Sequence, residues 1–351
     1  MESVFYIRTL KKADYTVFCV ADGQKSYWDP QFQRAVPYSS GQQVKRSMMT
    51  KVSDVLNVPM SPVTFISEVN KKKEISEGEV YGTCDPTYVD QLFGGWMRAS
   101  KGGKERTLKR RSPLSISAMR GLHPLLAGIA KENGTFDRSG AKETRIVVNE
   151  GDKTLSEAEI SELLAGKDRS LSRKWLADNK RATGLFVMDV AVDLRRLFSV
   201  SLDKLEPEIS EATEGKLREE GWLEVETAFG KSLTAPKEVR EAWIPALAEA
   251  LVNWSITSNQ SRTFSLMDTL AIAVSDNANR IAGSIRAKLK EDETPRAEPI
   301  VEEAMPGVDT FISLSADGVV RTTTEQFDAV DKAVASIIER MRAFDYESPL
   351  S

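Results

Sequence analysis

The sequence predicts an α+β fold with large inserted loops, and three observations support this class. Hydrophobic residues make up 41% of the 351 residues, enough to bury a core and too many for a disordered chain. Strand-like apolar runs alternate with amphipathic helical patterns, without the regular order of a doubly wound parallel sheet. Long polar and charged segments interrupt that alternation. The length exceeds what one compact core usually holds, so we expect one large elaborated domain or two domains.

The N-terminal region is predicted to form two strands followed by a helix. The β-branched and aromatic runs Val4–Thr9 and Tyr15–Val20, separated by LKKAD, predict a strand pair. A helix is predicted within and after AVPYSSGQQVKRSMM, residues 35–49, because apolar residues recur there at spacings of four, four and three. These apolar residues are Val44, Met48, Val52 and Val55, and the cap region before them comprises Ser39, Ser40 and Gly41.

Three elements are predicted in the second half of the chain. GLFVMDVAVDL, residues 184–194, is almost continuously apolar and predicts a central strand buried on both faces. A helix is expected from Pro236, and Pro245 should kink it or split it in two. TLAIAVS, residues 269–275, predicts another strand. The buried stripe of the helix is expected to comprise Val239, Trp243, Leu247, Ala250, Leu251 and Trp254.

The C-terminal region is predicted to form a hairpin and a last helix. Val308–Leu314 and Val319–Thr323 flank SADG, a turn signal. The helix is expected from about Glu325 to Phe344. Its buried stripe would be Phe327, Val330, Val334, Ile338 and Met341.

Cysteine content, hydropathy and charge limit the class of protein. Cys19 and Cys84 form neither a disulfide framework nor a CxxC pair, so a reducing cytoplasm is the expected location. Mean hydropathy is −0.33, no apolar run approaches the roughly 20 residues needed to span a bilayer, and the N-terminus lacks a signal-peptide pattern, so no membrane association is expected. The net charge of −4 means that any site for a polyanion must be local.

The charge distribution is uneven. RASKGGKERTLKRR, residues 98–111, holds seven basic residues and one acid, and such a loop favours phosphate. Residues 203–226 carry nine acids and three bases, which is typical of a solvated face.

Familiar catalytic motifs are missing from the sequence. HExxH, Walker A and GxSxG patterns do not occur, and the single histidine, His123, excludes a His-rich metal site. Asp22 and Asp29 could serve a nuclease, but carboxylates in a polar loop are also ordinary turn residues. We therefore expect no metal, no cofactor and no catalytic residue.

The predicted helix after Ser40 is a candidate anion site. A helix N-terminus presents backbone N–H groups and a partial positive charge, and Gln42, Gln43, Lys45 and Arg46 would extend that site into a track. The alternative is a plain capped helix packed on a sheet. A second polar stretch, SITSNQSRTFSLMD, combines hydrogen-bond donors with an aromatic residue, a combination that suits single-stranded RNA. Its candidate residues are Asn259, Gln260, Ser261, Arg262, Thr263 and Phe264.

At these residues the sequence resembles the RAMP-type backbone subunit of type I CRISPR-associated Cascade effector complexes, which coats the guide RNA. VPYSSGQQVKRSMM resembles its signature, and four further segments match in order and character, scattered from about residue 15 to 285. They are DQLFGGWM (90–97), RRSPLSISAMRGLHP (110–124), TGLFVMDVAVDLRRL (183–197) and NQSRTFSLMDTLAIAVSD (259–276).

The resemblance implies a right-hand-shaped subunit in which residues 1–85 and 183–351 form an RRM-like (ferredoxin-like) palm with fingers elements. Residues 86–182 would be an inserted fingers and thumb region that contains the basic loop 98–111. The implied RNA-binding residues are Arg34, Ser39, Ser40, Gly41, Gln42, Gln43, Lys45, Arg46, Trp96, Arg98, Arg110, Arg111 and the stretch Asn259–Phe264. Met119 or Leu122 would be an apolar wedge of the thumb, the alternative being packing within a hairpin.

The implied function is non-catalytic: copies would stack along CRISPR guide RNA in a helical filament and present guide bases to target DNA in antiviral defence. Other implied partners are the 5′-end-capping, large and small Cascade subunits. The alternative is a type III-like subunit that cuts target RNA with an aspartate near the thumb base, for which Asp22 or Asp29 would be the candidate.

Overall fold

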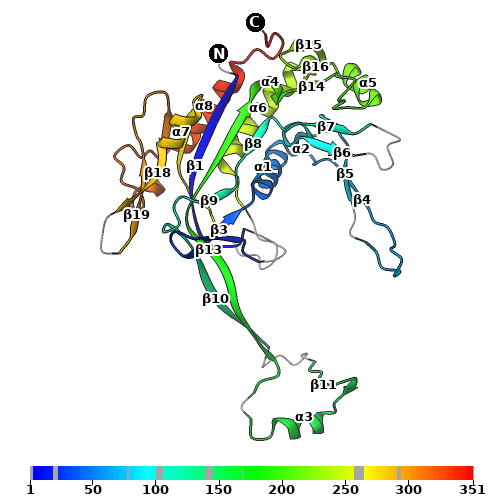
Figure 1. Ribbon diagram of the computed structural model, residues 1–351, viewed down its shortest axis with the longest axis vertical. Helices are drawn as coiled ribbons and strands as arrows, with labels where there is room; N and C mark the ends of the chain where they lie inside the picture. Colours follow the sequence, from blue (N-terminus) through cyan, green and yellow to red (C-terminus); the bar gives the residue numbers. More distant parts are fainter. Residues whose placement is uncertain are drawn as a thin grey trace.

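A large antiparallel sheet forms the body of the protein, and a long two-stranded ribbon extends from it (Figure 1). The computed structural model describes residues 3–18, 23–76, 79–99, 106–138, 145–167, 169–256, 265–290 and 294–350. The architecture is mixed α and β, and the predicted α+β class is confirmed at this level.

The centre of the sheet is β1 (Val4–Thr16), which pairs with β13 (Arg173–Asp193) on one side and with β17 (Thr269–Ser275) on the other. β8 (Leu114–Ile116) and β9 (Met119–Gly121) pair with the outer side of β13, and β20 (Asp309–Ile312) pairs with β17. Beyond β9 lie β3 (Arg34–Ser39) and then β2 (Ser26–Asp29). All of these pairings are antiparallel.

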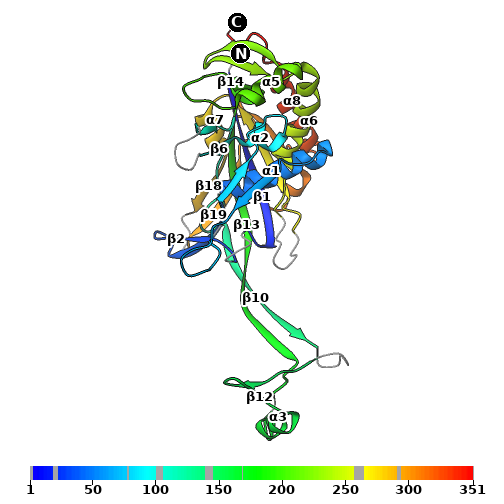
Figure 2. The same cartoon turned by 90° about the vertical axis from the view of Figure 1, so that its right-hand side faces the viewer.

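Helices cover one face of the sheet (Figure 2). α1 (Gly41–Leu56) connects the β1–β3 region to the next part of the chain, and α6 (Lys237–Asn253) precedes β17. α8 (Ala329–Arg342) joins them against inward-facing side chains such as Ile7 and Met188. The opposite face is partly covered by α7 (Ala278–Ser284) and the hairpin of β18 (Ile285–Lys290) and β19 (Arg296–Val301).

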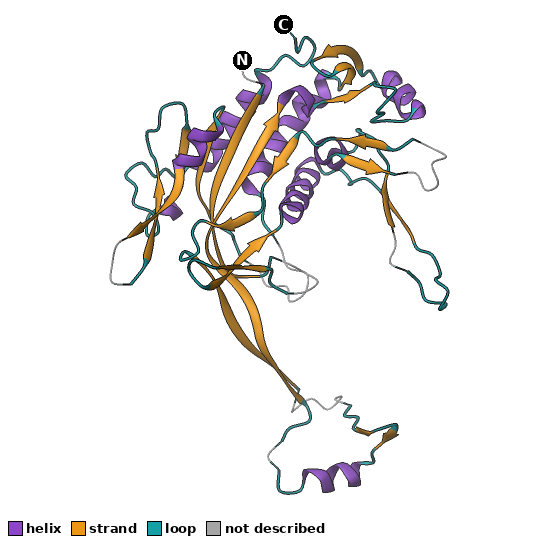
Figure 3. Ribbon diagram, viewed as in Figure 1, coloured by secondary structure: helices purple, strands orange, loops and turns teal. Residues whose placement is uncertain are grey.

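Several smaller units project from this body. β10 (Ala127–Asp137) pairs with β13 along the ribbon, and Figure 3 shows α3 (Glu157–Leu164) at its far end, next to β11 (Asn149–Glu150) and β12 (Lys153–Thr154). A group of elements beside α1 comprises β4 (Val63–Ile66), β5 (Glu79–Gly82), α2 (Val89–Gly94), β6 (Trp96–Arg98) and β7 (Leu108–Arg110). A third unit comprises α4 (Leu194–Leu197), β14 (Ser199–Ser201), α5 (Glu211–Glu219), β15 (Leu223–Thr227) and β16 (Gly230–Thr234).

The predicted N-terminal strand pair is wrong, because LKKAD continues a single strand. Leu10 and Lys11 are both buried, on opposite faces of β1. The Lys11 ammonium donates to the Val252 carbonyl (3.1 Å) and to Thr269 Oγ1 (2.7 Å), so a charged residue fits inside the strand. The only register shift of the β1–β13 pairing falls after Ala13, near Tyr15 with φ of 49°.

The helix predictions are confirmed with corrections. α1 has Ser40 as its N-cap and buries Val44, Met48, Met49 and Val52, whereas Val55 is 46% exposed. α6 is one helix despite Pro245. In α8 the fully buried residues are Ala329, Ala333, Ile337 and Met341, one position before most of the predicted stripe, and Phe327 is 87% exposed.

The two internal strands predicted at residues 184–194 and 269–275 are confirmed as the end of β13 and as β17. The prediction of a C-terminal hairpin is wrong. β20 pairs with β17 instead, and the chain then enters the 3-10 helix Leu314–Ala316. The Ala316 carbonyl accepts from the backbone N–H groups of Val319 and Val320, which closes a turn where the second strand was expected.

Candidate nucleic-acid interface

The N-terminal end of α1 is a built helix cap at the edge of the sheet. The Ser40 hydroxyl accepts from the backbone N–H of Gln43 (3.4 Å), and no acidic residue lies in the first turn. A Cβ atom on Gly41 would lie 2.8 Å from the Ile116 carbonyl oxygen, so only glycine fits where the helix start passes the β8–β9 connection. The cap therefore has a fixed position, with the positive end of the helix dipole uncompensated by a local carboxylate.

The side chains of residues 39–46 do not all point outward. Ser39 is buried and donates to Gln43 Oε1 (3.2 Å). The Lys45 ammonium donates to the Gly94 carbonyl (2.8 Å), and burial, followed by the nearby charge of Arg110, lowers the pKa of Lys45 to about 8. Gln42 and Arg46 are the exposed side chains of this track, whereas Ser40, Gln43 and Lys45 are half-buried.

Two predicted RNA-binding residues, Trp96 and Arg110, are buried and serve the fold instead. Trp96 Nε1 donates to the Glu208 carbonyl (2.6 Å), and the Arg110 guanidinium lies over the Trp96 ring at 5.4 Å. Arg110 also donates to backbone carbonyls of Leu92, Arg196 and Ser199, so its donors are consumed inside the protein. Burial lowers the pKa of Arg110 to about 10, with Glu208 opposing the shift. Arg98 and Arg111 are exposed.

The predicted role as an apolar wedge is wrong for Met119, which is packed inside the protein, and the alternative of packing within a hairpin is not observed, because β8 and β9 each pair with β13. Met119 lies in β9 opposite Ser39 and has no exposed surface. Leu122 is half-buried, and its backbone N–H donates to the Leu185 carbonyl (2.9 Å). Met119 is a strand residue of the sheet and Leu122 directly follows β9, and neither residue lies in the paired part of the ribbon.

Stretches that are distant in sequence meet at one end of the sheet. Gln24 links the exit of β1 to β3, because its side chain accepts from the Phe18 N–H (3.0 Å) and contacts the Tyr38 carbonyl (3.5 Å) next to the α1 cap. At the same end the Lys12 N–H donates to the Asp268 carbonyl (2.9 Å) and the Asp14 N–H to Ser265 Oγ (3.4 Å).

These bonds hold the C-terminal flank of the second predicted stretch. Asn259, Gln260, Ser261, Arg262, Thr263 and Phe264 themselves lie outside the described residues, as does Asp22. Arg34 lies in β3, where a Cβ atom on Gly128 of β10 would come within 3.1 Å of its guanidinium, so it stands at the base of the ribbon. Asp29 Oδ1 accepts from the Phe32 N–H (2.8 Å), which is an ordinary turn contact.

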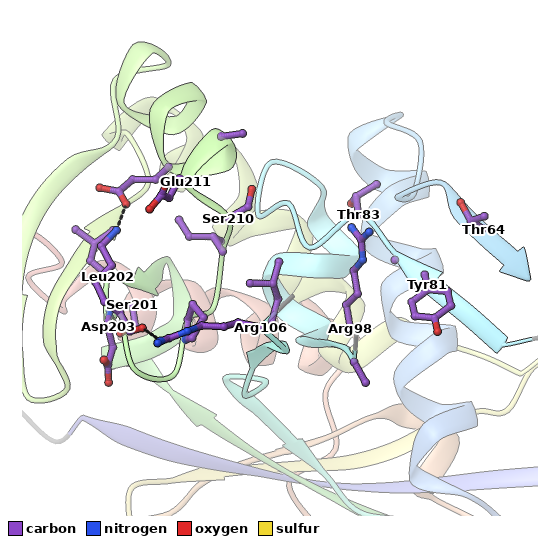
Figure 4. Close-up of a pocket in the computed structure, with 18 of the residues that line it drawn as sticks. Thr64, Tyr81, Thr83, Arg98, Arg106, Ser201, Leu202, Asp203, Ser210 and Glu211 are labelled. Atoms are coloured by element: carbon purple, nitrogen blue, oxygen red, sulfur yellow. Dashed lines mark hydrogen bonds and ion pairs between the residues drawn. The ribbon is translucent and has the colours of Figure 1, made fainter. Parts of the chain in front are cut away.

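A cleft of about 1460 Å³ lies between the β4–β7 elements and residues 201–214. In Figure 4, Tyr81 and Arg98 line one side and Asp203 and Glu211 the other. Arg106, next to the basic loop, donates to the Lys204 carbonyl across it. The predicted basic loop and the predicted acidic face are therefore neighbours. Sequence reasoning missed this cleft because its walls come from four separate segments.

None of the helices in the described parts of the chain combines the length and apolar character needed to cross a membrane. Within the same residues, no group of three or more His, Cys, Asp and Glu side chains could hold a metal ion.

Comparison with known proteins gives structural likeness only. No family model and no curated protein matches the chain. Its structure is similar to a chain of a "CRISPR RNA-guided surveillance complex, pre-nicking", with 10% identity, a TM-score of 0.46 and coverage of 97% of this chain and 88% of that one. A chain of a "CRISPR RNA-guided surveillance complex" gives 12% identity, a TM-score of 0.38 and coverage of 97% and 84%.

Proposed function

We propose that this chain is a non-catalytic RNA-binding subunit that polymerises along CRISPR guide RNA and presents guide bases for pairing with target DNA. One observation carries the proposal. The capped start of α1, with exposed Gln42 and Arg46, lies at the same end of the sheet as the flank of residues 259–264. Both stretches have the amino-acid composition expected of a protein segment that binds single-stranded RNA. Each stretch alone would be an ordinary helix cap or loop.

The topology of the sheet supports an RRM-like palm. The order β17, β1, β13 and β8/β9, with α1 after the first strand and α6 before the last, is a β-α-β-β-α-β arrangement with antiparallel neighbours. In this proposal residues 1–85 and 183–351, together with β8 and β9, form the palm with fingers elements, and the other parts of residues 86–182 form the inserted fingers and thumb. The ribbon of β10 and β13 is the natural candidate for the thumb because it projects furthest from the body (Figure 1).

The mechanism follows from helix-end chemistry. Backbone N–H groups at the start of α1 would bind one phosphate, and Arg46 would bind a neighbouring phosphate as a charge partner. Contacts to phosphate and ribose leave base edges free, so base pairing rather than the protein would supply sequence specificity. A head-to-tail contact that does not close gives a filament along the RNA, with the 5′-end-capping, large and small Cascade subunits as further partners.

The test is replacement of the exposed side chains at this site. Gln42→Ala with Arg46→Ala should abolish co-purification of guide RNA, measured by the ratio of absorbance at the nucleic-acid and protein bands, while circular dichroism stays unchanged. Lys231→Ala is the matched control, since Lys231 is an exposed lysine of β16 in a different unit of the protein. Retention of RNA by the double variant would remove the proposal.

Non-catalytic action has its own test. Purified complex incubated with target RNA and Mg²⁺ or Mn²⁺ should leave that RNA intact. Cutting at regular intervals, lost on Asp29→Ala or Asp22→Ala, would replace the proposal with a type III-like endonuclease.

A further inference from the structure

We propose that Tyr27, Tyr38 and Arg120 form a platform on which an unpaired nucleobase of single-stranded RNA stacks, on the face of the sheet opposite α1 and close in sequence to the start of that helix. This inference rests on the proposed function and adds a base contact to a site described so far by its phosphate contacts. The ligand class is any exposed base of a single strand, because stacking on aromatic rings and guanidinium planes tolerates every base.

The two tyrosine rings form an accessible pair on the β2–β3 hairpin. Their centroids are 6.2 Å apart at an interplanar angle of 58°, and Tyr27 is 41% exposed. Tyr38 is half-buried, so the pair presents one exposed and one partly exposed ring. Burial and the nearby Asp29 raise the pKa of the Tyr27 hydroxyl, with Arg120 opposing, so the ring remains neutral near pH 7.

Strand register places Arg120 on the same side as these rings. Tyr38 in β3 is directly opposite Arg120 in β9, and Tyr27 is paired with Val36, two residues before Tyr38. Residues opposite each other in an antiparallel pair share a face, and so do residues two apart. Trp28 is next to Tyr27 in the strand and therefore points to the other face, where it is 64% exposed.

The Arg120 guanidinium is held in place but remains accessible. Its two terminal nitrogens donate to Asp189 Oδ2 at 3.2 and 3.1 Å, and its side chain is 43% exposed. The Asp189 carboxylate also forms an ion pair with the Arg8 guanidinium, at 2.6 Å. One carboxylate therefore pairs with two guanidinium groups, and Arg8, Arg120 and Asp189 together keep a net positive charge. An oriented cation beside one exposed and one half-buried ring favours an aromatic ligand that carries phosphate.

The location connects this platform to the α1 cap. Ser39, the residue after Tyr38, is paired with Met119, the residue before Arg120, and α1 begins two residues after Ser39. Ser39 and Met119 face α1, so Tyr38 and Arg120 point to the opposite face of the sheet, where Asp189 and Arg8 lie. An RNA strand whose phosphate lies at the cap would therefore pass the end of β3 to place a base on the rings. RNA is a better fit than a protein ligand, because RNA carries both a phosphate for the cap and guanidinium and a base for the rings.

Binding of a base-bearing and a base-free strand tests the inference. The probes are a fluorescent 20-nucleotide oligouridine and a ribose-abasic strand of equal length and charge, titrated into the full-length protein. We expect wild-type protein to prefer the oligouridine about tenfold. Tyr27→Leu with Tyr38→Leu should remove this preference while retaining affinity for the abasic strand. Trp28→Leu should keep it, as should Tyr27→Phe with Tyr38→Phe, which preserves the rings.

Each outcome is decisive. An unchanged preference in the leucine double variant overturns the platform and leaves the proposed function standing. Loss of the preference in Trp28→Leu or in the phenylalanine variant also overturns it, since neither removes the rings. If wild-type protein binds neither strand, both the platform and the proposed function fail.

Discussion

Lys11 and Lys12 are neighbours in β1 but differ in burial and in their charge partners. Lys12 is partly exposed and pairs with Asp14 (3.1 Å), whereas Lys11 is buried beneath the end of α6 with its charge over the Trp254 ring. Burial, partly offset by Asp268, lowers the pKa of Lys11 to about 7 from 10.5. Between these two pH values the unfolded chain binds more protons than the folded chain.

The free energy of unfolding should therefore rise as the pH rises from about 7 to 10.5. Below about pH 7 Lys11 is protonated in both the folded and the unfolded chain, and its burial destabilises the fold by the full amount. Lys11→Met should reduce this pH dependence, and Lys12→Met, the matched control, should preserve it. Thermal unfolding at pH 7, 8 and 9 measures the effect. The same pH dependence in Lys11→Met and wild type would contradict the assignment.

Gly184 marks the point where β13 leaves the body and joins the ribbon. Its φ is +121°, and a Cβ atom would lie 2.2 Å from the Leu126 carbonyl oxygen. Gly184→Ala should lower the free energy of unfolding by about 2–4 kcal/mol through strain and a backbone clash. Gly151→Ala controls for positive φ alone, because Gly151 has φ of +59° and open space around it. Urea unfolding measures the free energy of unfolding of each variant. Equal decreases in the two variants would contradict a backbone clash at residue 184.

At the scale of elements, the tip of the ribbon contributes little to the stability of the body. α3 has no buried residue, and Val147 and Leu163 are 51% and 53% exposed. Replacing residues 138–172 with a short Gly-Ser turn between the ion-paired Asp137 and Arg173 should leave the melting temperature within a few degrees of wild type. It should prevent multi-copy assembly on RNA, measured by sizing chromatography. Normal assembly by the shortened chain would contradict a thumb role for this ribbon.

The sequence predicted elements whose signal is local and missed those fixed by distant contacts. α1 was predictable because Ser40 and the apolar spacing lie within one segment. Burial of Arg110 was not, because its partners Leu92 and Ser199 come from other units. The Tyr27–Arg120 platform was missed for the same reason, since only the β3–β9 pairing brings these residues together. The chain does turn near the predicted C-terminal turn signal, but β20 pairs with β17 instead of forming the predicted hairpin.

At the scale of the whole molecule, RNA binding should depend strongly on salt. The net charge is −4, so attraction to phosphate must come from local groups such as Arg46 and the helix dipole. Affinity for a 20-nucleotide single strand, plotted as its logarithm against the logarithm of salt concentration, should fall linearly. The slope should become shallower by roughly 0.7 in Arg46→Ala if that side chain neutralises one phosphate. An identical slope would exclude Arg46 from the phosphate contacts.

Electron cryo-microscopy of the chain co-expressed with a CRISPR array tests the central claim most directly. We predict several copies in head-to-tail order on one RNA, with a phosphate against the backbone N–H groups of Gly41 and Gln42 and the next phosphate near Arg46. Copies without RNA, or RNA that runs along another surface and leaves the start of α1 bare, would contradict the account.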